Sequence, residues 1–183
     1  MMIWQFILQC MYFMLPAYMA NMAPIIVRKR FKFLAKPLDF GISLKGKRVL
    51  GANKTLRGFI FGILFAVITT FIQFLIKDNA VFYYMTLPAL DYSKWLLLGL
   101  LLGSGALIGD AVESFFKRRV GIQPGKPWVP FDQTDFVIGA LVFVSIVYMP
   151  KWYVIISILL ISFLLHFITN HIAYLLKIRK EKW

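Results

Sequence analysis

Long runs of residues without charge are the feature that most limits what this chain can fold into. Residues 2–27, 58–76 and 152–176 carry no Asp, Glu, Lys or Arg. Each run is about 19 residues or longer, which is enough for a helix to cross the roughly 30 Å hydrocarbon core of a bilayer. With 60% hydrophobic residues over 183 positions, the chain is neither a soluble domain nor a disordered one. The pattern predicts an all-α, polytopic membrane protein.

Two further uncharged runs, residues 95–109 and 136–150, are too short to cross a membrane alone. At about 1.5 Å per helical residue, each covers only about 22 Å. Each run must therefore extend into the charged segment between them. This predicts spans at about 95–115 and 131–150, and five membrane helices in a single domain.

Basic residues are divided unequally between the two sides of this arrangement. Segments 28–57, 116–135 and 177–182 hold 18 of the 21 Lys and Arg residues, and the loops on the other side hold 3. By the positive-inside rule, the loops 28–57 and 116–130 and the C-terminus are cytosolic, and the N-terminus is outside. The topology in the cell membrane thus explains the net charge of +13. The charge therefore gives no reason to expect a nucleic-acid partner.

Four of the eight acidic residues lie close together in the chain, between residues 103 and 139. They are Asp110, Glu113, Asp132 and Asp135. If the flanking runs are membrane helices, Asp110 and Asp135 lie about one turn inside the apolar boundary, where an acid is costly and indicates a functional site with a cation partner. Asp132 could cap its helix, but Asp132 and Asp135 together, facing Asp110, would form an oxygen-rich Mg²⁺ site.

Cations accompany these acids on the same predicted helix. Ser114 and Lys117 follow Asp110 at i+4 and i+7 on one helix face, and Arg118 is next to that face. An alternative is that Lys and Arg form ion pairs within the helix or extend to the membrane surface. Small residues at Gly99–Gly109 would let neighbouring helices approach closely.

A glycine-rich basic segment, GANKTLRG at residues 51–58, directly precedes the second span. Glycines allow a backbone to approach a phosphate, and Lys54 and Arg57 supply charge. The spacing is not that of a P-loop, so a turn with topogenic charges is the simpler interpretation of this segment alone. Asn21, near the cytosolic end of the first span, either bridges helices or lines a polar substrate pocket.

Carboxylates for Mg²⁺, a Lys/Arg cluster and a glycine-rich loop at one membrane face suit phosphoryl or nucleotidyl transfer. One substrate would be a lipid phosphate at headgroup level and the other a soluble nucleotide. His166 and His171 do not share a helix face and predict no zinc site. A scaffold or channel is the non-enzyme alternative, but it predicts acids at both membrane faces, whereas these four share one.

Three motifs resemble the CDP-archaeol synthase family, relatives of the CTP-dependent phosphatidate cytidylyltransferases. They are PAYMANMAP, GANKTLRG and GDAVESFFKRRVGIQPGKPWVPFDQTDFVIGA, and the resemblance covers the whole chain. It implies transfer of CMP from CTP to an isoprenoid ether lipid phosphate, 2,3-bis-O-geranylgeranyl-sn-glycerol 1-phosphate, with release of pyrophosphate and with Mg²⁺. Phosphatidate as the lipid, which would give CDP-diacylglycerol, is the nearest alternative.

The resemblance also implies roles for individual residues. Asp110, Asp132 and Asp135 become the metal or phosphate-site carboxylates, and they act in catalysis with Lys117. The implied substrate-binding residues are Lys54, Thr55, Arg57, Ser114 and Arg118. The segment 51–58 departs from the family pattern, since Leu56 stands where an aromatic residue is common. Because the attacking lipid phosphate is already anionic at pH 7, the reaction needs no strong general base.

Overall fold

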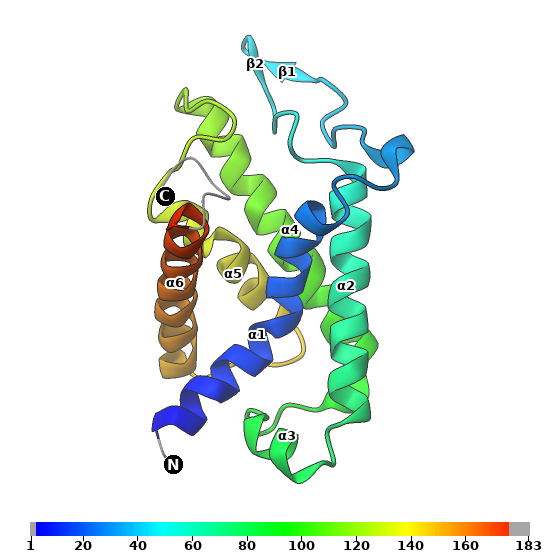
Figure 1. The fold of residues 1–183 in the computed structure, drawn as a ribbon, viewed down its shortest axis with the longest axis vertical. Helices are drawn as coiled ribbons and strands as arrows, with labels where there is room; N and C mark the ends of the chain where they lie inside the picture. Colours follow the sequence, from blue (N-terminus) through cyan, green and yellow to red (C-terminus); the bar gives the residue numbers. More distant parts are fainter. Residues whose placement is uncertain (1–2, 176–183) are drawn as a thin grey trace.

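The computed structural model describes residues 3–175 and shows a bundle of helices lying mainly along one long axis (Figure 1). The helices are α1 (Ile3–Ile26), α2 (Leu56–Leu75), α3 (Ala80–Met85), α4 (Trp95–Arg119), α5 (Phe131–Val144) and α6 (Trp152–Leu175), with 3-10 turns at Lys32–Leu34 and Tyr92–Lys94. A small antiparallel hairpin, β1 (Ser43–Leu44) with β2 (Lys47–Arg48), projects beyond one end of the bundle (Figure 1).

Four of the described helices are long and apolar enough to cross a membrane. They are Ile3–Ile26, Leu56–Leu75, Tyr92–Arg119 and Trp152–Ile172. The predicted class, an all-α polytopic membrane protein, is confirmed. The basic tail at 177–182, which contributed to the predicted orientation, lies outside the described residues.

The helix expected at 131–150 is shorter than the sequence analysis assumed. It ends at Val144, so α5 has 14 residues. At about 1.5 Å per residue this is about 21 Å, less than a bilayer core. A turn closes the helix, with the Tyr148 amide donating to the Val144 carbonyl at 2.9 Å, and Pro150 follows. A count of five complete spans therefore stays a prediction.

The third long helix, in contrast, extends past its expected end. α4 runs to Arg119, so the three consecutive cations at 117–119 are helical rather than part of a loop. The helix ends at Arg119. Two residues later, Gly121 has a φ of +85°, the left-handed conformation that glycine adopts readily. The Ile122 amide donates to the Lys117 carbonyl at 2.9 Å and completes the C-terminal cap.

Helices α4 and α5 pack with their backbones in contact. A Cβ atom at Gly139 would lie 2.2 Å from the Gly105 carbonyl oxygen, and one at Gly109 would lie 2.3 Å from the Asp135 carbonyl oxygen. Only glycine fits at such distances. The small residues of α4 thus bring the first turns of α5 directly against the segment that carries Asp110.

The chain between α1 and α2 forms a capping loop, residues 36–55, over the end of α4. The Arg119 guanidinium donates to the carbonyls of Leu44 at 2.8 Å, Lys47 at 3.0 Å and Arg48 at 2.6 Å. In return, Lys47 Nζ donates to the Arg119 carbonyl at 3.0 Å. These bonds attach the hairpin to α4, although the two lie more than 70 residues apart in sequence.

Asp39 is the buried acid of the capping loop, with a side chain only 1% exposed. Burial alone would raise its pKa, but the Arg48 guanidinium and the amides of Gly51, Gly41 and Leu50 outweigh burial and hold the pKa well below its usual range. A depressed pKa in the folded state means that the carboxylate's contribution to stability is complete above its unfolded pKa of about 4. The contribution is lost as the pH falls further, through the folded-state pKa.

We therefore expect the Leu50 and Gly51 amides, which donate to Asp39 at 3.1 and 3.0 Å, to stay protected from hydrogen exchange between pH 7 and about pH 4. Their protection should fall only in more acidic solution. Exchange measured across this range by mass spectrometry checks the result. The Val49 amide, which donates to the Ile42 carbonyl instead, is the internal reference. Loss of protection already at pH 5 to 6 would contradict the depressed pKa.

Candidate active site

Three carboxylates converge where α4 and α5 meet. Asp110 and Glu113 come from α4 and Asp135 from α5, and one oxygen from each lies within 4.8 Å of the others. This acid group exists because Gly109 lets the α5 backbone come against α4 beside Asp110. Carboxylate oxygens at such separations form the donor set that a hard cation such as Mg²⁺ prefers.

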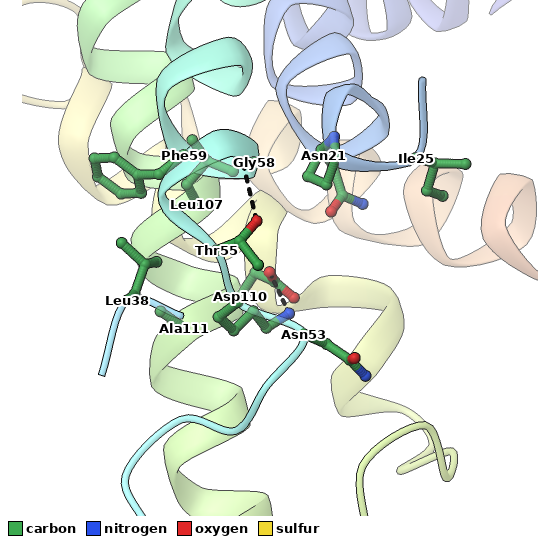
Figure 2. Close-up of a pocket in the computed structure, with 12 residues that line it drawn as sticks. Asn21, Ile25, Leu38, Asn53, Thr55, Gly58, Phe59, Leu107, Asp110 and Ala111 are labelled. Atoms are coloured by element: carbon green, nitrogen blue, oxygen red, sulfur yellow. Dashed lines mark hydrogen bonds and ion pairs between the residues drawn. The ribbon is translucent and has the colours of Figure 1, made fainter. Parts of the chain in front are cut away.

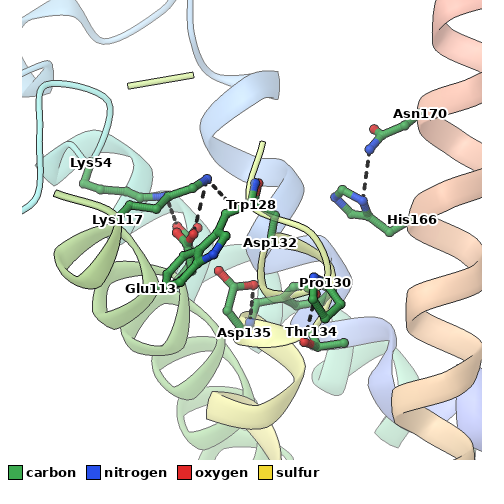
Figure 3. Close-up of polar contacts among 12 residues, drawn as sticks. Lys54, Glu113, Lys117, Trp128, Pro130, Asp132, Thr134, Asp135, His166 and Asn170 are labelled. Atoms are coloured by element: carbon green, nitrogen blue, oxygen red, sulfur yellow. Dashed lines mark hydrogen bonds and ion pairs between the residues drawn. The ribbon is translucent and has the colours of Figure 1, made fainter. Parts of the chain in front are cut away.

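Two lysines from different parts of the chain border the acid group (Figure 3). Lys54, from the capping loop, has its Nζ 2.5 Å from Asp110 Oδ2. Lys117, one turn beyond Glu113 on α4, has its Nζ 3.2 Å from Glu113 Oε1. Both lysine side chains therefore reach a carboxylate of the acid group while keeping further donor positions.

Asp132 adjoins the acid group at Glu113 but is not one of its three members. Its Oδ1 pairs with Lys117, and its Oδ2 accepts a 2.7 Å hydrogen bond from the Trp128 amide. Asp132 is not the N-cap of α5 either, because Pro130 holds that position and Asp132 is in the first turn. The structure thus brings Asp110 and Asp135 together as the sequence suggested, but the third member of the group is Glu113.

Asp135 has no cationic partner in the described part of the chain. Within residues 3–175, no ion pair includes it, and its Oδ1 accepts a 2.6 Å hydrogen bond from the Phe136 amide. Asp110 and Glu113, in contrast, each face a lysine. A carboxylate in a helix interface without a counter-ion is costly unless a cation binds beside it. The acid group therefore fits a bound metal.

A cleft of about 190 Å³ opens next to Asp110, between α1, α2, α4 and the capping loop (Figure 2). Asn21, Lys54, Thr55 and Asp110 give it a polar side. Its apolar side is formed by Pro24, Ile25, Leu38, Phe59 and Leu107. The structure thus gathers at one cleft three predicted substrate-binding residues, from the segments around residues 21 and 54, and one predicted metal ligand, Asp110.

Thr55 also has a structural role at this cleft. Its Oγ1 accepts a hydrogen bond from the Gly58 amide at 3.2 Å, which caps the N-terminus of α2. The cap fixes the residue that follows Lys54, so it helps to direct Lys54 toward Asp110. Figure 2 shows the Thr55 hydroxyl directed at Gly58, while the residue also lines the cleft.

The other predicted substrate-binding residues occupy different surroundings. Arg57 is 8% exposed and donates to the Arg30 carbonyl at 2.9 Å, so it ties the chain after α1 to α2 and does not line the cleft. Ser114 is 5% exposed on α4. Arg118 has buried Nε and Nη1 atoms without hydrogen-bond partners, next to Gly51 of the capping loop. Among the described residues, Arg118 leaves two donor atoms without a hydrogen-bond partner and Arg57 leaves one, its Nε, so Arg118 has more to offer an anion.

The two histidines lie on α6. His166 Nδ1 is 3.0 Å from Asn170 Nδ2, and Figure 3 shows this pair apart from the acid group. The Phe167 and His171 rings stack with centroids 4.4 Å apart. These contacts give both histidines a packing role on α6.

The chain is similar to proteins of one family. The model of the CarS-like CDP-archaeol synthase family matches residues 3–183. A CDP-archaeol synthase of Methanocaldococcus jannaschii is 38% identical over 187 residues, which cover 100% of both chains. One of Methanopyrus kandleri is 36% identical over 94% of this chain and 91% of its own. A solved structure of an intramembrane enzyme for archaeal membrane lipids biosynthesis has a TM-score of 0.72 at 30% identity, covering 87% of this chain and 91% of its own.

The fold and the site together define an intramembrane nucleotidyltransferase, built from long apolar helices around a pocket of carboxylates and cations. Such a pocket can hold phosphates and a divalent ion at the membrane surface. The chain belongs to the CDP-archaeol synthase family. The resemblance identified in the sequence, and the enzyme class that it implied, are confirmed.

Proposed function

We propose that the protein transfers CMP from CTP to the phosphate of an isoprenoid ether lipid, 2,3-bis-O-geranylgeranyl-sn-glycerol 1-phosphate, and releases pyrophosphate. The observation that carries this proposal is the acid group beside the cleft, in which Asp135 has no counter-ion among residues 3–175. Family membership supports the overall reaction. The geometry supports the roles of the individual residues given below.

Asp110, Glu113 and Asp135 would hold Mg²⁺ through their carboxylate oxygens. When bound, the ion supplies charge neutralisation for the phosphates of CTP. Lys54 and Lys117 also neutralise phosphate charge, since they lie beside the acid group and can donate to phosphate oxygens. Arg118 Nε and Nη1 have no hydrogen-bond partner among the described residues, so they can also donate to a phosphate beside the capping loop.

The attacking group is an oxygen of the lipid phosphate, which displaces pyrophosphate from the α-phosphorus of CTP in line. The new bond joins this oxygen to the α-phosphorus, and the bond to the β-phosphate oxygen breaks. Because the lipid phosphate is already ionised at pH 7, the chain has to position and neutralise charge rather than remove a proton. The placement of His166 on α6, apart from the acid group in Figure 3, is consistent with this chemistry.

The cleft suits a lipid headgroup on its way to the acid group. Its polar side offers the Asn21 amide and Lys54, and its apolar side, which includes Ile25, Phe59 and Leu107, suits the first carbons of the isoprenoid chains. Because α1 and α2 are membrane-spanning helices, the lipid phosphate can stay at headgroup depth while it reacts. The nucleotide would arrive from the cytosol, the side to which the basic loops assign this end of the bundle.

The test is a transfer assay with the purified protein in detergent. We expect labelled CTP, Mg²⁺ and the ether lipid phosphate to give a CDP-lipid, EDTA to stop the reaction, and added Mg²⁺ to restore it. Phosphatidate, the ester alternative, is supplied in a parallel reaction and should react more slowly. Product from neither lipid would refute the enzyme assignment. Faster reaction with the ester would refute the assigned lipid class.

A further inference from the structure

The capping loop carries Lys54 to the acid group, and its shape depends on one buried side chain, Asp39, which does not line the cleft. The loop begins with two paired segments, in which the Leu38 amide donates to the Lys54 carbonyl at 2.8 Å and the Leu56 amide donates to the Lys36 carbonyl at 2.9 Å. Pro37 and Thr55 face each other in this antiparallel bridge. Asp39 follows immediately, where the loop leaves the bridge.

Asp39 receives four hydrogen bonds, all from within the loop. Its Oδ1 accepts from the Gly41 amide at 3.1 Å and from Arg48 Nη2. Its Oδ2 accepts from the amides of Leu50 and Gly51 at 3.1 and 3.0 Å. One carboxylate therefore fixes both the outgoing and the returning strand of the loop, on either side of the β1–β2 hairpin.

The returning strand leads directly to the cations of the site. Gly51 has a φ of +100°, which glycine adopts readily, and an added Cβ there would lie 3.9 Å from Arg118 Nε. Three residues later comes Lys54, whose Nζ reaches Asp110. The bonds to Asp39 thus set the path of the backbone between the Arg118 contact and the Lys54 contact.

We propose that Asp39 is a positioning residue for the transfer reaction, which holds the capping loop in the shape that places Lys54 against Asp110 and Gly51 against Arg118. Asp39 does not line the cleft and belongs to no described ion pair except that with Arg48. It acts through Lys54 and does not touch the substrate. The inference rests on the proposed function, in which Lys54 binds phosphate.

A double-mutant cycle tests this coupling. We expect Asp39→Asn to lower kcat/KM for CTP by about 10- to 100-fold. This range is typical when a residue that orients a binding residue, without touching the ligand itself, is changed. With Lys54→Met already present, the same change should cost less than about twofold, because the side chain that Asp39 positions is gone. An equal loss in both backgrounds, or an unchanged rate for Asp39→Asn alone, would overturn the proposal.

Two matched variants separate positioning from general damage. Asp78→Asn removes an exposed acid that pairs with Lys77, and it should leave kcat/KM unchanged. Arg48→Met removes one of the four partners of Asp39, so its loss should lie between those of the parent and Asp39→Asn. If Arg48→Met and Asp39→Asn had equal rates, the ion pair alone would set the shape of the loop, without the three backbone hydrogen bonds. That result would overturn the proposal.

Hydrogen exchange gives a reading that does not depend on catalysis. The Leu38 amide donates to the Lys54 carbonyl, so its exchange reports whether Lys54 keeps its place. We expect faster exchange at Leu38 in Asp39→Asn, with unchanged exchange in α2 and α4. Faster exchange with an inactive parent protein would refute the proposed function and leave Asp39 as the organiser of the loop. Unchanged exchange at Leu38 would overturn the positioning role itself.

Discussion

Asp135→Asn is expected to lower kcat/KM for CTP by about 10³-fold while the helical bundle stays folded. An amide of the same size keeps the packing of α5 but replaces one of the three anionic ligand groups for a cation with a neutral one. A metal contributes several kcal/mol of charge stabilisation in the transition state, and each 1.36 kcal/mol is about tenfold in rate, which sets the expected loss. Initial rates at several Mg²⁺ concentrations check the result.

The accompanying variants decide which carboxylates form the metal site. Glu113→Gln should raise the Mg²⁺ concentration needed for half-maximal rate, as Asp135→Asn does. Asp132→Asn should shift that concentration less than either variant, because Asp132 contacts Glu113 and Lys117 but is not one of the three carboxylates of the acid group. Unchanged Mg²⁺ dependence in both Glu113→Gln and Asp135→Asn would contradict the proposed site. A shift in Asp132→Asn alone would restore the set first inferred from the sequence.

The metal site shows where sequence reasoning reaches its limit. The depth of Asp110 and Asp135 in apolar runs indicated that both face a cation, and the structure places them together. Glu113 was overlooked as a ligand because its position four residues before Lys117 is explained equally well by an ion pair within the helix. Glu113 also lies three residues after Asp110, which puts both on neighbouring parts of the same helix surface. This spacing could have indicated that Glu113 is a ligand.

Asp132 illustrates a different limit. At i, i+3 from Asp135 it lies on a similar side of α5, but which partner it meets depends on how far α4 extends. Because α4 continues to Arg119, Lys117 sits on an ordered helical turn and can bind Asp132. The end of a helix is the least certain part of a sequence-based assignment. Here the position of the α4 end decides whether Asp132 pairs with Lys117.

The residues of segment 51–58 divide according to the start of α2. Lys54 precedes the Thr55 cap and reaches the acid group, whereas Arg57 lies in the first helical turn and binds the Arg30 carbonyl. Sequence spacing alone treats the two as equivalent phosphate ligands. Their separation follows from the cap, because Lys54 precedes the extended Thr55 whereas Arg57 lies inside the helix that begins after it. The role of Asp39 was equally hidden, since its partners come from residues 41–51 of an irregular loop.

Gly139→Ala is expected to have the largest effect of any single methyl group added to this protein. The new Cβ would lie 2.2 Å from the Gly105 carbonyl oxygen and 2.8 Å from the Gly109 Cα, and backbone atoms cannot turn aside as a flexible side chain can. The two helices must therefore separate locally. Overpacking of this kind typically costs about 1–3 kcal/mol of stability, so thermal unfolding in detergent should occur at a clearly lower temperature.

Activity should fall further than stability alone explains. Gly109 adjoins Asp110 in the chain, and Asp135 lies one helical turn before Gly139, so separating the helices also widens the acid group. A displacement of about 1 Å at a catalytic site can cost about 100-fold in rate. Rates are compared well below the unfolding temperature, with Val142→Ala on the 60% exposed side of α5 as the control. A Gly139→Ala protein with the parent's unfolding temperature and rate would mean that α4 and α5 do not touch through their backbones, and the acid group would lose its structural basis.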